Sequence, residues 1–312
     1  MNALASAHTS VLLQESIDGL DIKPDGLYVD ATFGRGGHSR AILQHLGDKG
    51  RLIALDRDTA AIEAAQALVE DKRFSIHHRP FAELESLMES LGHSRDIDGI
   101  LMDIGVSSPQ LDEAQRGFSF QQDGPLDMRM DTTSGQSAAQ WLNTASLEDI
   151  TTVIKRFGEE KFGKRIAHAV LEYRESKLLE TTAEFAKLID QAVPVKDKFK
   201  HPATRTFQGV RIFINGELDQ LEQGLLAATK VLKPGGRLAV ISFHSLEDRM
   251  VKRFIKEQSA GTVYPSKLPV LQSELDKGKV LVPVGKAIKP SEQEVSANKR
   301  SRSSVLRVAQ KL

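Results

Sequence analysis

Four short apolar runs in the first 103 residues alternate with segments of helical periodicity. The runs have the length and composition of buried strands, and we predict strands at 27–30, 51–56, 74–77 and 97–103. Residues 40–46 and 59–69 are predicted to form the intervening helices. Apolar strands separated by helices favour a mainly parallel sheet with helices on both faces. The sequence therefore predicts an α/β fold.

The strand–helix alternation stops after the fourth run. Residues 105–211 show helical periodicity without a convincing strand, most clearly at 137–142, 146–157, 166–175 and 182–192. Trp141 lies in the first of these apolar patterns and is predicted to be a core residue. A helix at 208–232, a turn at 233–236 and a strand at 237–242 then resume the earlier pattern.

The interval between the fourth and fifth strands is too long for a simple crossover. Such a connection needs about a dozen residues plus short loops, whereas about a hundred lie here. We therefore predict an inserted all-α domain at 111–210, within an α/β domain made of 1–110 and 211–312. After a helix at 246–258, a strand at 304–309 is predicted to close the sheet at its edge.

The chain contains no cysteine. This excludes disulfides, thiolate zinc sites and any pyrimidine modification that depends on an attacking thiolate. The sequence holds no apolar run of about 18 residues, so no membrane contact is expected. Its N-terminus lacks the pattern of a signal peptide, and a cytoplasmic protein is therefore predicted.

The net charge is zero, with 42 basic and 42 acidic residues, which argues mildly against a nucleic-acid-binding protein. The distribution of charge matters more than the sum. Basic residues cluster at 196–211, 249–253 and 299–302. Each cluster is either an RNA-facing surface or a solvated face of a neutral protein.

A glycine-rich turn follows the first predicted strand. Gly34, Gly36 and Gly37 lie between the strand and its helix, where a tight turn must bring the backbone close to a ligand. Asp56 follows at the carboxyl end of the second strand, where a carboxylate can accept both hydroxyls of a ribose. The order of strand, turn, helix, strand and acid predicts a nucleoside-binding site.

The residues of the turn discriminate between two cofactors. A dinucleotide fingerprint fits poorly, because Ser39 occupies the position of the third glycine. Asp30 precedes the turn and would repel a pyrophosphate at the helix N-terminus. S-adenosylmethionine has no phosphate and carries a sulfonium and an ammonium, so the same acid favours it. We predict S-adenosylmethionine as the cofactor.

Eight ordered motifs span essentially the whole chain: HTSVLL at 8–13, DATFGRGGHS at 30–39, DIGVSSPQ at 103–110, RGFSF at 116–120, GPLDMRM at 124–130, HPATRTFQ at 201–208, SFHSLEDR at 242–249 and RSRSS at 300–304. As a set they resemble the bacterial 16S ribosomal RNA cytosine-N4 methyltransferases. The resemblance implies a Rossmann-like class I methyltransferase fold and N4-methylation of a cytidine in small-subunit RNA.

The resemblance also implies cofactor contacts for seven residues: Gly36, Gly37, His38, Asp56, Phe81, Asp103 and Gln110. From the residues alone, a core phenylalanine is the favoured interpretation of Phe81. Thr32 stands where the first glycine of the methyltransferase turn is usual, and this is a departure from the common pattern.

Methylation of a cytosine amine is difficult because the nitrogen lone pair is delocalised into the ring. A hydrogen-bond acceptor beside the amine can draw it toward tetrahedral geometry. The residues after the fourth strand that could contribute are Asp103, Ser107, Ser108 and Pro109, and no aromatic residue directly follows the proline. The sequence leaves open whether Asp103, a serine or a loop carbonyl is the acceptor. Direct in-line transfer requires no metal and no covalent intermediate.

RNA contacts are predicted on the inserted domain. A base must leave the stack to reach such a site, and the basic segment 196–211 could bind the flanking phosphates. Lys198, His201 and Arg205 are candidate substrate-binding residues, as is His244 after the fifth strand. A single histidine is more often a structural hydrogen-bonding residue, and that alternative stays open.

The expected partner is 16S ribosomal RNA or the small ribosomal subunit, and the sequence leaves monomer and homodimer open. A second hypothesis is a catalytically inactive RNA-binding protein on a methyltransferase scaffold. Intact Asp30, Asp56 and Asp103 argue against it. A third, a dinucleotide oxidoreductase, is disfavoured by the turn.

Overall fold

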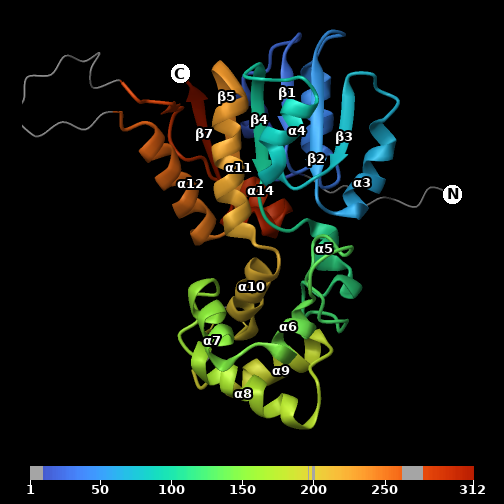
Figure 1. Cartoon of the computed structure of the whole chain (residues 1–312), viewed down its shortest axis with the longest axis vertical. Coiled ribbons are helices and arrows are strands. Elements are labelled where there is room, and N and C mark those ends of the chain that lie inside the picture. The colour runs from blue at the N-terminus through green and yellow to red at the C-terminus, as the bar shows by residue number, and fades with distance from the viewer. Residues whose placement is uncertain (1–9, 196, 199–200, 262–276) are drawn as a thin grey trace, which may run out of the picture. The chain divides into compact units, whose positions relative to one another are not determined.

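The computed structural model describes residues 10–195, 197–198, 201–261 and 277–312. The chain divides into two compact units, Met1–Gly105 with Asp219–Leu312 and Val106–Leu218 (Figure 1). We call the first the sheet unit and the second the helical unit. The predicted insert begins later and ends earlier than the helical unit. Residues 8–9 of the first motif and residues 196 and 199–200 of the basic segment lie outside the described residues.

The sheet unit contains a seven-stranded sheet of order β3-β2-β1-β4-β5-β7-β6. Its strands are β1 (Leu27–Asp30), β2 (Arg51–Asp56), β3 (Phe74–His78), β4 (Ile97–Asp103), β5 (Leu232–Ser242), β6 (Leu281–Pro283) and β7 (Val305–Lys311). The first five strands pair in parallel, and β7 pairs antiparallel with both β5 and β6. The predicted mainly parallel α/β sheet is confirmed.

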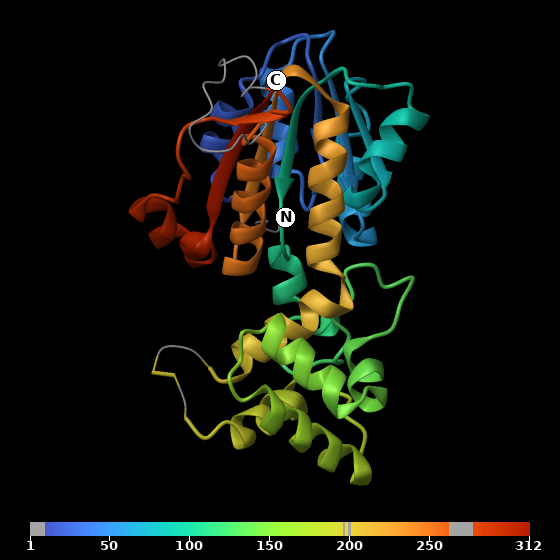
Figure 2. The same cartoon turned by 60° about the vertical axis from the view of Figure 1, so that its left-hand side comes forward.

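Helices cover both faces of this sheet (Figures 1 and 2). They are α1 (Leu13–Leu20), α2 (Gly37–His45), α3 (Thr59–Ala65), α4 (Leu84–Ser90), α11 (Glu217–Val231), α12 (Ser245–Gln258) and α14 (Glu292–Ala297), with 3-10 turns η1 (Gln66–Leu68), η2 (Phe81–Glu83) and η4 (Lys299–Ser303). Leu52 and Ala54 point to the face covered by α1 to α3, whereas Ile53 and Leu55 point to the face covered by α4, α11 and α12. This burial on both sides explains why the strand is apolar throughout.

The predicted helix at 208–232 is wrong as a single element. The structure has two helices there, α10 (Ala203–Ile214) and α11, separated at Asn215 and Gly216. Gly216 has a φ of 57°, in the left-handed region that ends a helix. Helical periodicity continues across the break, so spacing alone does not reveal it.

Two strand boundaries also differ from the prediction. The residues predicted as a turn at 233–236 belong to β5. Ile97 of β4 pairs with Leu232 and Gly99 pairs with Arg237, so residues 233–236 fall in an irregular part of the pairing. The strand predicted as the closing edge, β7, lies inside the sheet because β6 pairs with its outer side. β6 has three residues, too few for alternation to indicate a strand.

The helical unit is built from α5 (Ser108–Asp112), η3 (Ala114–Arg116), α6 (Ala138–Thr144), α7 (Leu147–Arg156), α8 (Gly163–Ser176), α9 (Thr182–Ala192) and α10. Capping boxes begin α6 at Ser137 and α9 at Thr181. Trp141 is only 5% exposed and lies in the core of this unit, which confirms its predicted role.

Two glycines allow a close approach between α7 and α10. A Cβ on Gly209 would lie 2.7 Å from the backbone nitrogen of Gly158, and a Cβ on Gly158 would lie 2.5 Å from the carbonyl oxygen of Arg205. Both neighbours are backbone atoms, so neither can move aside without shifting a whole segment. Among the described residues, no helix is both long and apolar enough to traverse a lipid bilayer.

Gly209→Ala should destabilise the helical unit by about 1–3 kcal/mol, because the added methyl group must push α10 away from the chain after α7. Amide hydrogen exchange read by mass spectrometry should show faster exchange in α7 and α10, with β1 to β5 unchanged. The control is Lys187→Ala, at an exposed position on α9. Unchanged exchange in both helices would show that the contact is less tight than described.

Candidate active site

Three carboxylates end three neighbouring strands. Asp30 is the last residue of β1, Asp56 of β2 and Asp103 of β4. The parallel register aligns these ends, with Asp30 opposite both Ala54 and Leu101. The carboxyl ends of parallel strands form the edge at which ligands of such sheets bind. The three acids therefore lie together along the edge where the sequence predicts a cofactor.

The glycine turn between β1 and α2 is held against both neighbouring strands. The backbone nitrogen of Phe33 donates to the carbonyl of Leu55, and that of Ala31 donates to the carbonyl of Leu101. Gly34 and Gly36 have positive φ values of 56° and 75°, which glycine adopts without strain. A Cβ on Gly37 would overlap the Ser10 hydroxyl, so this glycine admits a neighbouring segment of the chain itself.

Asp56 fixes the turn while keeping acceptor capacity. Its Oδ2 accepts from the backbone nitrogen of Gly34 at 2.8 Å, and its Oδ1 accepts from that of Asp58 at 2.8 Å. Burial raises the pKa of the Asp56 carboxyl. The backbone of Arg57 also donates to this carboxyl. A carboxylate has about four lone-pair positions, so Asp56 keeps capacity to accept a hydrogen bond from a ribose.

Asp30 acts from beneath the turn. Its side chain is fully buried, and its two oxygens accept from the Thr32 backbone nitrogen at 3.2 Å and from the Ser39 hydroxyl at 2.6 Å. Burial raises the pKa of Asp30 to about 6, and the nearby Asp56 carboxylate adds to the effect. Both oxygens of Asp30 are engaged within the protein, so its predicted preference for a cationic cofactor would act through its charge.

Asp103 has an oxygen available for a ligand. Its Oδ1 is buried and makes no hydrogen bond to any described residue. Burial, with repulsion by the carboxylates of Asp30 and Glu247, raises the pKa of Asp103 to about 8. A cation or a hydrogen-bond donor at this position would relieve both penalties. The residues present therefore fit the ammonium and sulfonium of S-adenosylmethionine.

His38, in the first turn of α2, is oriented toward Asp103. Its Nε2 lies 3.1 Å from the carbonyl oxygen of Val11, which can only accept, so Nε2 carries a hydrogen. Its Nδ1 then faces the Asp103 Oδ2 at 3.7 Å. Thr32 holds the same strand end, because its hydroxyl accepts from the Asp103 backbone nitrogen at 2.7 Å.

Glu247 is a completely buried acid in the first turn of α12, the helix that follows β5. Its Oε2 accepts from the backbone nitrogens of Phe243 and His244 at 2.8 and 3.2 Å. His244 is the N-cap of α12 and forms a capping box with Glu247. The structure thus gives His244 a structural role at this edge, and its predicted contact with substrate stays a prediction.

Phe81 begins the 3-10 turn after β3 and is packed against the core. A Cβ on Gly224 of α11 would lie 2.5 Å from the Phe81 ring, so the absence of a side chain at Gly224 leaves room for this ring. This packing fits the core role that the residues alone suggest. The adenine contact that the resemblance implies stays a prediction.

The candidates after β4 belong to the helical unit. Ser107 caps α5, and its backbone nitrogen donates to the Gln110 Oε1 at 2.9 Å within a capping box. Ser108 and Pro109 form the first turn of the helix. Gln110 is buried, and part of its amide serves this cap. The predicted roles of these four residues in cofactor binding and catalysis stay predictions.

Three predicted RNA contacts gather before and within the first turns of α10. Lys198 and Arg205 are exposed. His201 stacks on Phe120 with ring centroids 4.7 Å apart, and its Nδ1 accepts from the Ala203 backbone nitrogen at 3.2 Å. His244 lies in the sheet unit, so the structure divides the predicted substrate-binding residues between the two units.

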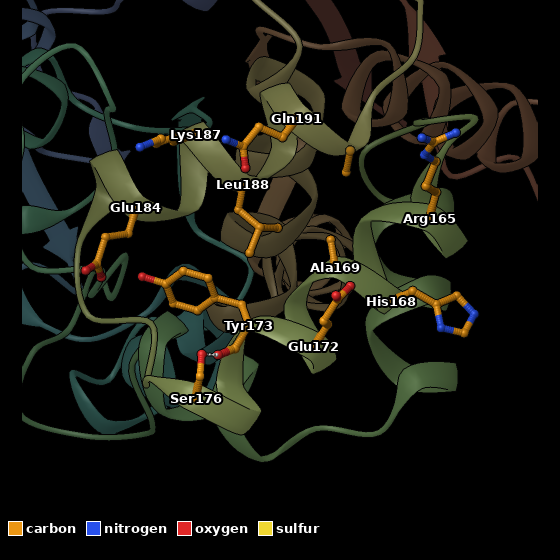
Figure 3. A pocket seen from close by; sticks show the side chains of 11 residues that line it. Arg165, His168, Ala169, Glu172, Tyr173, Ser176, Glu184, Lys187, Leu188 and Gln191 are labelled. Atoms are coloured by element: carbon orange, nitrogen blue, oxygen red, sulfur yellow. Dashed lines mark hydrogen bonds between the residues drawn. The ribbon is translucent and has the colours of Figure 1, made fainter.

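A groove of about 830 Å³ lies between α8 and α9 of the helical unit (Figure 3). Tyr173 and Leu188 form its apolar part, and Arg165, Lys187 and Glu172 lie around it. None of the residues predicted from the sequence lines it. The mixed charge of its lining does not select an anionic over a cationic ligand.

Sequence reasoning missed two residues at the edge of the sheet. In the sequence Thr32 is only a departure from the methyltransferase turn, whereas in the structure its hydroxyl accepts a hydrogen bond from the β4 backbone at Asp103. Glu247 follows His244 by three residues, and a glutamate three residues after an N-cap indicates a capping box. That signal could have been found in the sequence, whereas the burial of Glu247 could not.

Comparison with known proteins decides the family. The sequence pattern of the MraW methylase family matches residues 5–312. The chain belongs to this family. A protein of Alteromonas mediterranea named ribosomal RNA small subunit methyltransferase H is 67% identical over 305 residues, 98% of this chain and 97% of that protein. A protein of the same name from Pseudoalteromonas atlantica is 65% identical over 98% of both chains.

Solved structures show only a weak likeness to this MraW methylase. The crystal structure of an rRNA methylase from Streptococcus thermophilus has 12% sequence identity and a TM-score of 0.40, with 98% of this chain and 99% of that chain covered. This similarity adds nothing to the assignment. Family membership confirms the resemblance drawn from the eight motifs and the prediction that the chain is a methylase.

Asp103→Asn should raise the melting temperature by a few degrees near pH 8 and by much less near pH 5. In the unfolded chain the carboxyl ionises near its ordinary pKa of 3.8, whereas in the folded protein it keeps its proton to about pH 8. The folded wild type therefore loses stability as the pH rises through this interval, and the amide variant does not. Scanning calorimetry at several pH values measures the difference. Asp25→Asn, at an exposed position, is the control, and a pH-independent difference would contradict the assignment.

Asp56→Ala should weaken binding of S-adenosylhomocysteine by about tenfold or more, because two ribose hydroxyls lose a charged acceptor. Isothermal titration calorimetry measures the affinity, and Asp25→Ala serves as the control. Asp56→Asn retains one acceptor oxygen and should have an intermediate affinity. Equal affinities for wild type and Asp56→Ala would refute the ribose assignment.

Proposed function

We propose that this protein transfers the methyl group of S-adenosylmethionine to the N4 amine of a cytidine in small-subunit (16S) ribosomal RNA. The observation that carries the proposal is the Asp103 carboxyl, whose buried Oδ1 makes no hydrogen bond to any described residue, at the same edge of the sheet as the glycine turn and Asp56. A site of this kind fits a nucleoside cofactor with a positive charge. The name of the two relatives, ribosomal RNA small subunit methyltransferase H, supports the RNA substrate.

The residues of the sheet unit divide the binding of the cofactor among them. Asp56 accepts the ribose hydroxyls, and the turn with Gly34, Gly36 and Gly37 gives the backbone its close approach. Asp103, with His38 behind it, holds the positively charged end. Phe81 completes this set on the adenine side, and Gln110, which belongs to the helical unit, is the remaining cofactor contact. S-adenosylmethionine supplies an electrophilic methyl group on its sulfonium, so direct transfer suffices chemically.

Asp103 and the residues that follow β4 act on the cytosine amine that receives the methyl group. An oxygen of Asp103, Ser107 or Ser108, or a carbonyl of the loop at Pro109, accepts from the cytosine amine and favours a nitrogen with an available lone pair. The capping box already engages Ser107, which favours Ser108 or a carbonyl. Holding the amine and the methyl group in line lowers the activation barrier by roughly 7–11 kcal/mol.

The helical unit recognises the RNA. Exposed Lys198 and Arg205 contact phosphates. His201, whose ring contacts that of Phe120, contacts the target nucleotide. His244 contributes from the sheet unit. Because the proposed substrate is ribosomal RNA, the proposed location is the cytoplasm. Light scattering of the purified protein distinguishes a monomer from a homodimer.

Purified protein should transfer labelled methyl from S-adenosylmethionine to small-subunit RNA or particles, and nuclease digestion should yield N4-methylcytidine by mass spectrometry. Asp103→Ala should reduce the rate by at least about a hundredfold, because the methyl donor then has no charged partner. Asp25→Ala should retain the wild-type rate. Label found only on adenine or on protein would refute the substrate, and tight RNA binding without any transfer would favour the inactive RNA-binding alternative.

A further inference from the structure

Helix α12 has an apolar face and a basic face. Val251, Phe254 and Ile255 are buried in the core of the sheet unit. The opposite face is exposed and carries the basic residues Arg249, Lys252, Arg253 and Lys256. Packing fixes the helix, so the basic side chains have a defined place on the surface. Figures 1 and 2 show α12 beside α11 on the same face of the sheet.

The four basic residues form one stripe. Their spacing of i, i+3, i+4 and i+7 places them on a single side of the helix, over about 10 Å of its length. We call these four residues the α12 stripe. A row of this length matches a few consecutive phosphates of a nucleic-acid strand better than it matches a single small anion.

The two lysines of the stripe lie in a basic part of the sequence and are not paired with acids among the described residues. Residues 249–312 contain 14 Lys and Arg against 5 Asp and Glu, although the whole chain has 42 of each. Glu257 lies 3.6 Å from Arg253 in an exposed pair, which contributes little. Asp248 is engaged by Arg307 at 2.7 Å, and Glu247 is buried. Among the described residues, Lys252 and Lys256 make no ion pair.

The helix starts at the edge where the candidate active site lies. Ser245, its first residue, follows β5 by three positions, and Ile241 of β5 pairs with Asp103. The capping box of His244 and Glu247 anchors this end of the helix. The stripe therefore runs from the first turns of α12 away from the edge that holds Asp103.

We propose that the α12 stripe binds phosphates of the substrate RNA strand next to the methylated nucleotide, as a second RNA-binding surface in addition to the helical unit. The inference rests on the proposed function, because it takes RNA as the substrate. The stripe adds phosphate contacts to those of the helical unit, and a base cannot leave the stack without interactions that compensate for the stacking energy.

The test is the double variant Lys252→Gln with Lys256→Gln, which removes two charges and keeps good helix formers. Methyl transfer to small-subunit RNA is measured as a function of salt. The KM for RNA should rise roughly tenfold, and the slope of its logarithm against the logarithm of salt should fall by about 1.4, since each phosphate that is no longer neutralised accounts for about 0.7. Affinity for S-adenosylhomocysteine and the melting temperature should stay at their wild-type values.

Lys49→Gln with Lys72→Gln is the matched control. Both lysines are exposed on the sheet unit and precede β2 and β3, at the opposite ends of the strands. This variant should keep the wild-type KM and salt slope. If the α12 variant matches the control while the wild type methylates RNA, the stripe proposal is wrong and the proposed function stands. If the wild type methylates no RNA, the proposed function fails and the stripe proposal fails with it.

Discussion

The carboxyl of Asp103 lies where burial and two neighbouring acids oppose its ionisation, and the chemistry of the site depends on this constraint. A group whose pKa is raised to about 8 costs the folded protein stability when it must carry charge at neutral pH. A positively charged ligand relieves the repulsion by Asp30 and Glu247. The strand ends are therefore electrostatically complementary to a sulfonium-bearing nucleoside before any contact is made, as expected of a preorganised site.

The strands and their acidic ends could be predicted from the sequence because each depends on local pattern. Apolar runs ending in Asp30, Asp56 and Asp103 indicate both the sheet and the edge that binds ligand. Other features depend on tertiary structure. The break at Gly216 interrupts a helical spacing that continues on both sides, and the three residues of β6 have no pattern of their own. The side-chain partners of Asp103 come from segments that the fold alone brings together.

The site also shows how two kinds of residue share one turn. Positive φ favours glycine at Gly34 and Gly36, whereas Gly37 leaves room for the side chain of Ser10. The glycine pattern alone predicts a turn and a nearby ligand but does not separate these causes. Thr32 stands in place of a glycine, and its hydroxyl accepts a hydrogen bond from the β4 backbone at Asp103. A departure from a common motif can therefore carry a structural function of its own.

A net charge of zero conceals a strong segregation of charge along the chain. The basic excess after residue 249 must be balanced by an acidic excess before it, which includes the buried acids of the strand ends. The two distributions suit different ligands: buried acids suit a small cation, which favours their ionised form, and exposed basic residues suit a polyanion. Helix α12 contributes to both distributions. Its capping box holds Glu247 near Asp103, and its outer face carries the basic stripe. The position of a charge, buried at a strand end or exposed on a helix, therefore decides which partner it can bind.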